Sequence, residues 1–322
     1  MIDGVGPAMC LLSAAFFGAM PIFGKFAYEA GVTPGTLLLV RFSLAATVLA
    51  VLLLLRPSLR RTDPTHLAPP DRPAMSRARV VVIAIGLGCL GYATQSRLYF
   101  SALQHIDASL LALILYTYPV LVTAGSVLLG RDRVTPARAV ALVTASGGTV
   151  LLLVGAGAGS FHPLGAGLAF GGAIVYTTYI LVSDTVVRRL PPVVLSTLVM
   201  TGAAAGLGAQ SALTGGVSLE FAPSAWFWLV CIALVSTVMA VLAFFAGLRR
   251  TGPSTAAILS TFEPVVTATL ASLTLGEFLT GLQLVGGVLV LASVVVLQLR
   301  PARATDQPAA KPDARAVLDT TS

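Results

Sequence analysis

Long apolar runs constrain this chain more than any other feature. Helices of about 20 apolar residues rise roughly 30 Å, which is enough to cross the hydrocarbon core of a bilayer. Ten such runs occur, at approximately 7–28, 34–55, 80–103, 107–129, 135–155, 164–187, 192–214, 225–248, 252–276 and 280–299. The chain is 56% hydrophobic and 10% charged, whereas soluble domains are about 25% charged. We therefore predict an all-α polytopic membrane protein with ten transmembrane helices.

The basic residues predict the orientation. Apart from Lys25, Arg41 and Arg97, every Lys and Arg lies in a loop after an even-numbered span, at the start of the fifth span, or in the tail. The opposite loops contain acidic residues and neither Lys nor Arg. By the positive-inside rule both termini are cytoplasmic, so the net charge of +7 indicates topology and not a nucleic-acid partner.

Two cytoplasmic segments are expected to be disordered, Pro57 to Ser76 within the Pro- and Arg-rich loop 56–79, and the tail 300–322. The excess of Arg over Lys is a habit of GC-rich bacterial genomes, so we expect the bilayer to be a bacterial inner membrane.

An internal repeat is visible at an offset of 145 residues (119 against 264), where Pro119 and Pro264 occupy equivalent positions. The first repeat covers residues 1–156 and the second 157–299. Because each holds five predicted helices, the second must be inverted relative to the first. Prolines within spans interrupt helices, and inverted repeats with interrupted helices at mid-membrane are typical of secondary transporters.

Glu263 lies near the centre of the apolar stretch 251–275. An acid at that depth is costly unless it faces protein or water, so it marks a candidate functional site. Pro264 cannot continue the backbone hydrogen bonding, which should free the Ser260 carbonyl beside the carboxylate. Glu263 could carry a proton or bind a substrate ammonium group. The alternative is a structural role as a polar contact between helices.

Basic and aromatic side chains suggest the rest of the site. Arg41 is the deepest basic residue, and it could bind an anionic group or form an interhelical ion pair with Glu263. Arg97 shares a polar face with Thr94 and Ser101, so we expect it to point inward, while Lys25 is expected to reach the interface. Tyrosines suit a binding cavity. The predicted substrate-binding residues are Arg41, Arg97, Tyr99, Tyr116, Tyr118 and Glu263, with Glu263 also the candidate coupling residue.

No motif for catalysis, a cofactor or a metal is recognisable. The GxGxxG pattern at 86–91 lies inside a predicted span, without the strand–turn–helix context of a nucleotide site. The three histidines fall in predicted loops, and Glu277 is expected to cap the last helix. We predict that the protein is not an enzyme.

The chain resembles the ten-helix, EamA-type members of the drug/metabolite transporter superfamily. The residues that carry this resemblance are Phe16-Phe17-Gly18, Gly24-Lys25, Arg41-Phe42, Tyr116-Thr117-Tyr118-Pro119, Gly147-Gly148, Glu263-Pro264, Gly276-Glu277 and Gly286-Gly287. The resemblance implies alternating access around a cavity between the repeats, with small organic metabolites as substrates. The chain departs from the family after the fourth span, where Gly130-Arg131-Asp132 replaces the usual Gly-Glu.

These observations lead us to expect a secondary transporter for a small polar or zwitterionic, amino-acid-like metabolite, with proton coupling as one candidate driving mechanism. Two alternatives stay open. One is an uncoupled facilitator. The other is a non-transporting structural or sensory membrane protein in which Glu263 forms a structural ion pair. The sequence does not indicate an oligomeric state.

Overall fold

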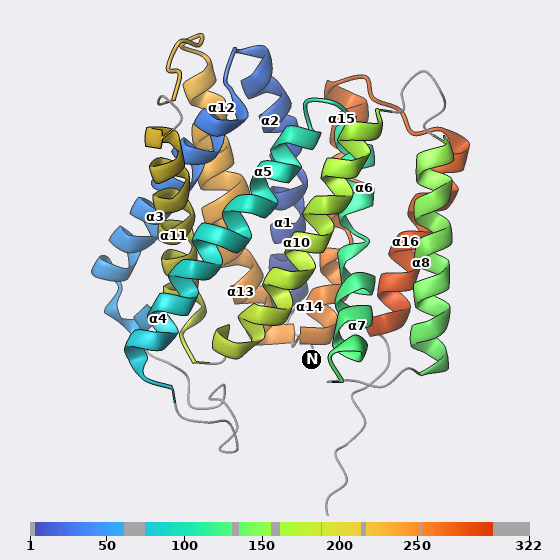
Figure 1. Cartoon of the computed structure of the whole chain (residues 1–322), viewed down its shortest axis with the longest axis horizontal. Helices are drawn as coiled ribbons and strands as arrows, with labels where there is room; N and C mark the ends of the chain where they lie inside the picture. The colour runs from blue at the N-terminus through green and yellow to red at the C-terminus, as the bar shows by residue number, and fades with distance from the viewer. Residues whose placement is uncertain are drawn as a thin grey trace, which may run out of the picture.

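The computed structural model describes residues 4–60, 75–130, 135–155, 162–187, 189–213, 217–251 and 253–298. Within these ranges every regular element is helical (Figure 1). The elements are α1 (Val5–Gly18), α2 (Met20–Glu29), α3 (Pro34–Leu55), η1 (Pro57–Arg60), α4 (Arg77–Gly86), η3 (Leu87–Tyr92), α5 (Ala93–Ala102), α6 (Ala108–Leu115), α7 (Tyr118–Leu128), α8 (Pro136–Gly155), α10 (Pro163–Val187), α11 (Pro192–Leu213), α12 (Ala225–Ala233), η4 (Leu234–Met239), α13 (Ala240–Thr251), α14 (Pro253–Ser260), α15 (Glu263–Thr274) and α16 (Gly281–Gln298).

Seven helical stretches in the described part of the chain are long and apolar enough to cross a membrane. They are Val5–Glu29, Pro34–Leu55, Arg77–Ala102, Ala108–Leu128, Pro163–Ser183, Pro192–Leu213 and Ala225–Leu248, and the stretches Ala139–Gly155, Ile258–Thr274 and Gly281–Val296 are apolar but shorter. The predicted all-helical, multi-span class is thus confirmed. The number of ten spans and the inverted repeat stay predictions.

The helices run roughly side by side as an upright bundle, with α8 and α16 paired along one edge (Figure 1). Glycines allow the closest approaches. A Cβ on Gly202 of α11 would lie 2.1 Å from the Ile85 carbonyl oxygen, and one on Gly88 of η3 would lie 2.0 Å from that of Val199. Gly148 and Gly286 face each other in the same way between α8 and α16. Small residues let membrane helices pack backbone to backbone.

Two long helical stretches are interrupted at equivalent positions. α6 ends at Leu115 and α7 begins at Tyr118, while α14 ends at Ser260 and α15 begins at Glu263. In each case the proline predicted to kink the chain, Pro119 or Pro264, is the second residue after the interruption, where a missing N–H costs nothing. The two restarts are 145 residues apart (118 against 263), which is the offset of the sequence repeat.

Two π-helical turns, η3 and η4, interrupt the stretches 77–102 and 225–251. Single π-turns inside α-helices often lie at functional sites because they leave backbone carbonyls free and redirect side chains. Here Tyr92 is the last residue of η3 and Thr237 lies within η4. Both side chains contact the same buried arginine, as described below.

The segments predicted to be disordered are only partly within the described residues. Pro57–Arg60 forms a 3₁₀ turn, so disorder was wrong for these residues, while residues 61–74 and the tail 300–322 lie outside the described ranges.

Candidate substrate-binding site

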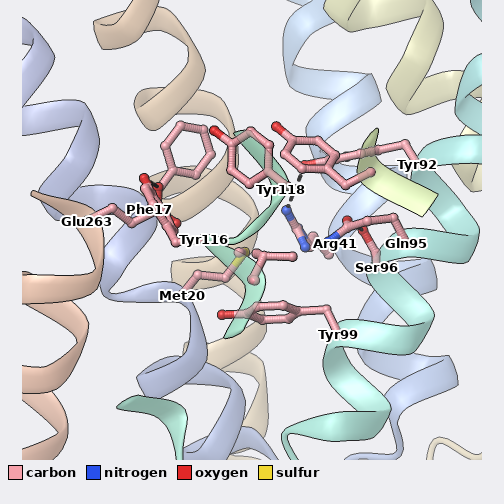
Figure 2. Close-up of a pocket in the computed structure, with 12 residues that line it drawn as sticks. Phe17, Met20, Arg41, Tyr92, Gln95, Ser96, Tyr99, Tyr116, Tyr118 and Glu263 are labelled. Atoms are coloured by element: carbon pink, nitrogen blue, oxygen red, sulfur yellow. Dashed lines mark hydrogen bonds between the residues drawn. The ribbon is translucent and has the colours of Figure 1, made fainter. Parts of the chain in front are cut away.

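A cavity of about 100 Å³ lies inside the bundle (Figure 2). Side chains from both sequence repeats surround it, and five of the six predicted substrate-binding residues are among them. The lining residues are Phe17, Met20, Arg41, Tyr92, Gln95, Ser96, Tyr99, Leu115, Tyr116, Tyr118, Tyr176 and Glu263. The cavity is therefore a small chamber with one basic residue, one acidic residue and several tyrosines in its wall.

Arg41 is on α3 and is almost completely buried, with 1% of its surface exposed. Its Nε donates to Thr237 Oγ1 at 2.9 Å and its Nη2 to the Tyr92 hydroxyl at 3.3 Å. The guanidinium carbon lies 4.9 Å from the ring centre of Phe42 and 5.6 Å from that of Phe100. These partners are all uncharged, and no carboxylate within the described residues pairs with the arginine.

Glu263 is the first residue of α15, where the positive end of the helix dipole favours an acidic group. The Tyr116 hydroxyl lies 3.0 Å from its Oε2 and 2.6 Å from the Ser260 carbonyl oxygen. The Ser260 carbonyl is the group that Pro264 was expected to free. α15 is fixed in place by α1, since Thr267 Oγ1 donates to the Gly18 carbonyl at 2.9 Å.

Arg41 and Glu263 do not form the ion pair that the sequence left open. The ion pair found in the described part of the chain joins Lys25 and Glu277 instead. In Figure 2 the two charged side chains lie on opposite sides of the cavity, with Tyr116 and Tyr118 between them. Each charged group is thus left accessible to a ligand.

A series of tyrosine rings connects the two ends of the cavity. Successive ring centres are 5.8, 4.7, 5.9 and 5.8 Å apart along the series Tyr116, Tyr118, Tyr176, Tyr179 and Tyr92. Tyr116 contacts Glu263 and Tyr92 contacts Arg41. Such a wall offers apolar ring faces along its length and hydroxyl groups at intervals.

Arg97 is the predicted site residue that the structure does not bring to the cavity. Its side chain is exposed and its Nη1 donates to the Gln210 side chain on α11. The expectation that it points inward was wrong, because the inward face of α5 at this level carries Gln95, Ser96 and Tyr99.

Several lining residues were not predicted as site residues. Tyr92 and Ser96 precede the predicted residue Tyr99 by seven and three positions, so helical spacing could have placed them on the same face. Thr237 is 196 residues from Arg41, and nothing local in the sequence indicates that contact.

A second polar cluster lies outside the cavity, at the start of α6. Glu277 Oε1 is 3.3 Å from Lys25 Nζ, and Oε2 accepts from the Ala108 N–H at 2.8 Å. Glu277 was expected to cap the last helix, α16, but it caps α6 instead. At the start of α16, Thr280 and Gln283 cap the helix through reciprocal hydrogen bonds. Burial raises the pKa of the Glu277 carboxyl, although the Lys25 ammonium acts in the opposite direction.

Comparison with known proteins identifies the family. The model of the EamA-like transporter family matches residues 4–154 and 163–299. The chain belongs to this family. The EamA protein is 26% identical over 288 residues to YcbK, an uncharacterized transporter of Bacillus subtilis (strain 168), covering 87% of this chain and 88% of the relative. It is 27% identical over 214 residues to an uncharacterized transporter of Archaeoglobus fulgidus, covering 66% and 74%.

A crystal structure with 20% sequence identity matches 91% of the EamA protein and 96% of its own chain, with a TM-score of 0.62. At that identity the match supports the fold alone. The family and both relatives are named as transporters, and several helices are long and apolar enough to cross a membrane. The EamA protein is thus a multi-pass membrane protein of a transporter family and not of an enzyme family. No group of three potential metal ligands occurs among the described residues.

Proposed function

We propose that this EamA protein is a secondary transporter that moves a small zwitterionic, amino-acid-like metabolite across the bacterial inner membrane. One observation carries the proposal: Arg41 and Glu263 line the same cavity, and neither forms an ion pair with the other. Buried charges are costly unless they are paired. A substrate carboxylate at Arg41 and a substrate ammonium at Glu263 would pair both charges at once.

The positions of the helix interruptions support alternating access between two inverted five-helix repeats. The interruptions at 116–117 and 261–262 follow the 145-residue offset, and each is next to a cavity-lining side chain, Tyr116 or Glu263. Substrate sites in such transporters are formed by interrupted helices at the repeat interface. The distribution of Lys and Arg supports a cytoplasmic location for both termini by the positive-inside rule.

Proton coupling is supported by the hydrogen bonds of Tyr116. Its hydroxyl has one hydrogen and lies within bonding distance of two acceptors, the Ser260 carbonyl and Glu263 Oε2. A protonated Glu263 could donate to the Tyr116 oxygen while Tyr116 donates to Ser260. An ionised Glu263 instead competes with Ser260 for the same hydrogen. The protonation state of Glu263 would therefore change how the interruption between α14 and α15 is held.

The structural alternative requires Glu263 to form an ion pair on which the stability of the folded protein depends. Arg41 is not that partner, because it is bound by Thr237 and Tyr92. The facilitator alternative shares the same cavity and differs only in coupling. It predicts that substrate flux is independent of a pH gradient.

The first test is the thermal stability of the detergent-solubilised protein with a panel of amino acids, amines and small carboxylates at two pH values. A ligand present at 100 times its dissociation constant stabilises the folded state by about 2.7 kcal/mol. We expect hits among zwitterions. Arg41→Gln should abolish them, and Glu263→Gln should weaken them, because the glutamine side chain keeps one oxygen that accepts from an ammonium group. Two results would show that the substrate binds elsewhere. One is a hit that survives both substitutions, and the other is equal binding by ligands that lack one of the two charged groups.

Coupling is tested separately in proteoliposomes loaded with the compound identified by that panel. Glu263→Gln is expected to abolish accumulation driven by a pH gradient while exchange down a substrate gradient continues. Accumulation by Glu263→Gln at the wild-type rate would exclude Glu263 as the coupling residue.

A further inference from the structure

The Arg41 end of the cavity holds more hydrogen-bond donors than acceptors. A guanidinium carries five N–H hydrogens and no acceptor. Arg41 uses its Nε hydrogen for Thr237 and one Nη2 hydrogen for Tyr92, and makes no other hydrogen bond within the described residues. Three N–H hydrogens of a side chain that is 1% exposed are therefore available at the cavity.

The groups around Arg41 are themselves donors. The Tyr92 oxygen accepts from Arg41, so its own hydrogen is left to donate, and no described acceptor takes it. Gln95 is 7% exposed, and its Oε1 accepts from Ser96 at 3.3 Å, which leaves its amide hydrogens without an acceptor in the described chain. The hydrogen of Thr237 already goes to the Ile232 carbonyl at 2.9 Å. Donors from α3, η3 and α5 thus converge on one space.

No acidic side chain among the described residues forms an ion pair with Arg41. Glu263 is the single acidic residue in the cavity wall, and it lies on the opposite side with Tyr116. Cation–π contacts with the rings of Phe42 and Phe100 offset only part of the free-energy cost of burying the guanidinium ion. An anion beside Arg41 would supply the missing charge and accept the unused hydrogens.

The space limits which anion fits. A cavity needs roughly 10–15 Å³ to hold one water molecule, so the volume of about 100 Å³ accepts a small ion with a few waters. One arginine provides one positive charge, which in a largely apolar chamber favours a monovalent over a divalent anion. Chloride meets both conditions, and sulfate, which is divalent, fails the second.

We propose that the Arg41 end of the cavity, formed by Arg41, Tyr92 and Gln95, binds a small monovalent inorganic anion of the chloride class in the substrate-free protein. The carboxylate of a substrate then displaces this anion, and the exchange leaves the charge around Arg41 unchanged. The displacement step rests on the proposed function, whereas the anion site itself does not.

The anion site is tested with the purified full-length protein and no metabolite. Its melting temperature is measured as sodium sulfate, whose divalent anion the site should disfavour, is replaced by sodium chloride at constant ionic strength. We expect a saturable rise with chloride and also with bromide. Tyr92→Phe and Gln95→Leu, which each remove donors from the site, should shift the midpoint to several-fold higher chloride. Arg97→Gln is the matched control, because it removes an arginine outside the cavity and should keep the wild-type midpoint.

Equal melting temperatures in chloride and sulfate would overturn the anion site, and so would a chloride midpoint unchanged in both Tyr92→Phe and Gln95→Leu. Displacement is tested by adding sodium acetate, which should raise the chloride midpoint in proportion to its concentration. If acetate leaves the chloride midpoint unchanged, the displacement step is refuted. If zwitterions bind but chloride does not change the melting temperature, the anion site is refuted while the proposed transport function stands.

Discussion

Replacing Tyr116 by Phe removes a single oxygen atom, and the structure allows the cost to be worked out. The hydroxyl is the hydrogen-bond partner of the Ser260 carbonyl at 2.6 Å and of Glu263 at 3.0 Å. When Glu263 is ionised, one hydrogen serves both acceptors, so the loss is that of one bond and not two. A buried acceptor left without a donor costs about 1–3 kcal/mol, and we expect a loss of stability in this range.

The matched control is Tyr118→Phe, which deletes the same atom type in the same cavity. The Tyr118 hydroxyl makes no hydrogen bond within the described residues, so its removal should cost less than about 1 kcal/mol. Both variants can be compared by thermal unfolding in the same detergent, where 1 kcal/mol corresponds to about 2–4 °C for soluble proteins of 150–250 residues. Hydrogen exchange of the amides from 261 to 266 should also increase in Tyr116→Phe and remain unchanged in Tyr118→Phe.

Equal losses in the two variants would refute this reasoning, because the stability would then reflect the loss of any tyrosine hydroxyl and not the bond to Ser260. A Tyr116→Phe variant as stable as the wild type would show that the interruption between α14 and α15 is held by packing alone.

Three further predictions concern other parts of the fold. Gly202→Ala places a Cβ about 2.1 Å from the Ile85 carbonyl oxygen and should sharply lower the folded yield, whereas Gly147→Ala, with no atom within 4 Å of the added Cβ, should be tolerated. Burial raises the folded-state pKa of Glu277 above its ordinary value of 4.5. The folded state therefore binds more protons, and stability from this group should fall as pH rises above 4.5. Glu277→Gln should flatten that part of a stability–pH profile, and an unchanged profile would contradict the assignment. Arg97→Gln should leave ligand-induced stabilisation unchanged, since the Arg97 side chain is exposed outside the cavity. Loss of that stabilisation would show that Arg97 contributes to ligand binding.

The interruption at Glu263 could be predicted from the sequence because its cause is local. Pro264 lacks an N–H, so the Ser260 carbonyl cannot make its helical bond, and the structure shows that carbonyl accepting from Tyr116. Which residue would use the free carbonyl was not predictable, because Tyr116 is 144 residues away in the chain.

The sequence by itself determined the helical class, the membrane setting and the presence of isolated charged groups within apolar stretches. These follow from the length of the apolar runs and from the chemistry of single residues. Tertiary structure alone decided that Thr237 and Tyr92 hold Arg41, that Arg97 faces outward, and that Glu277 caps α6. The physical reason is that membrane helices are apolar toward lipid as well as toward each other. Their periodicity therefore does not mark the buried face, and only close packing, such as that of Gly202 against Ile85, determines which side chains meet.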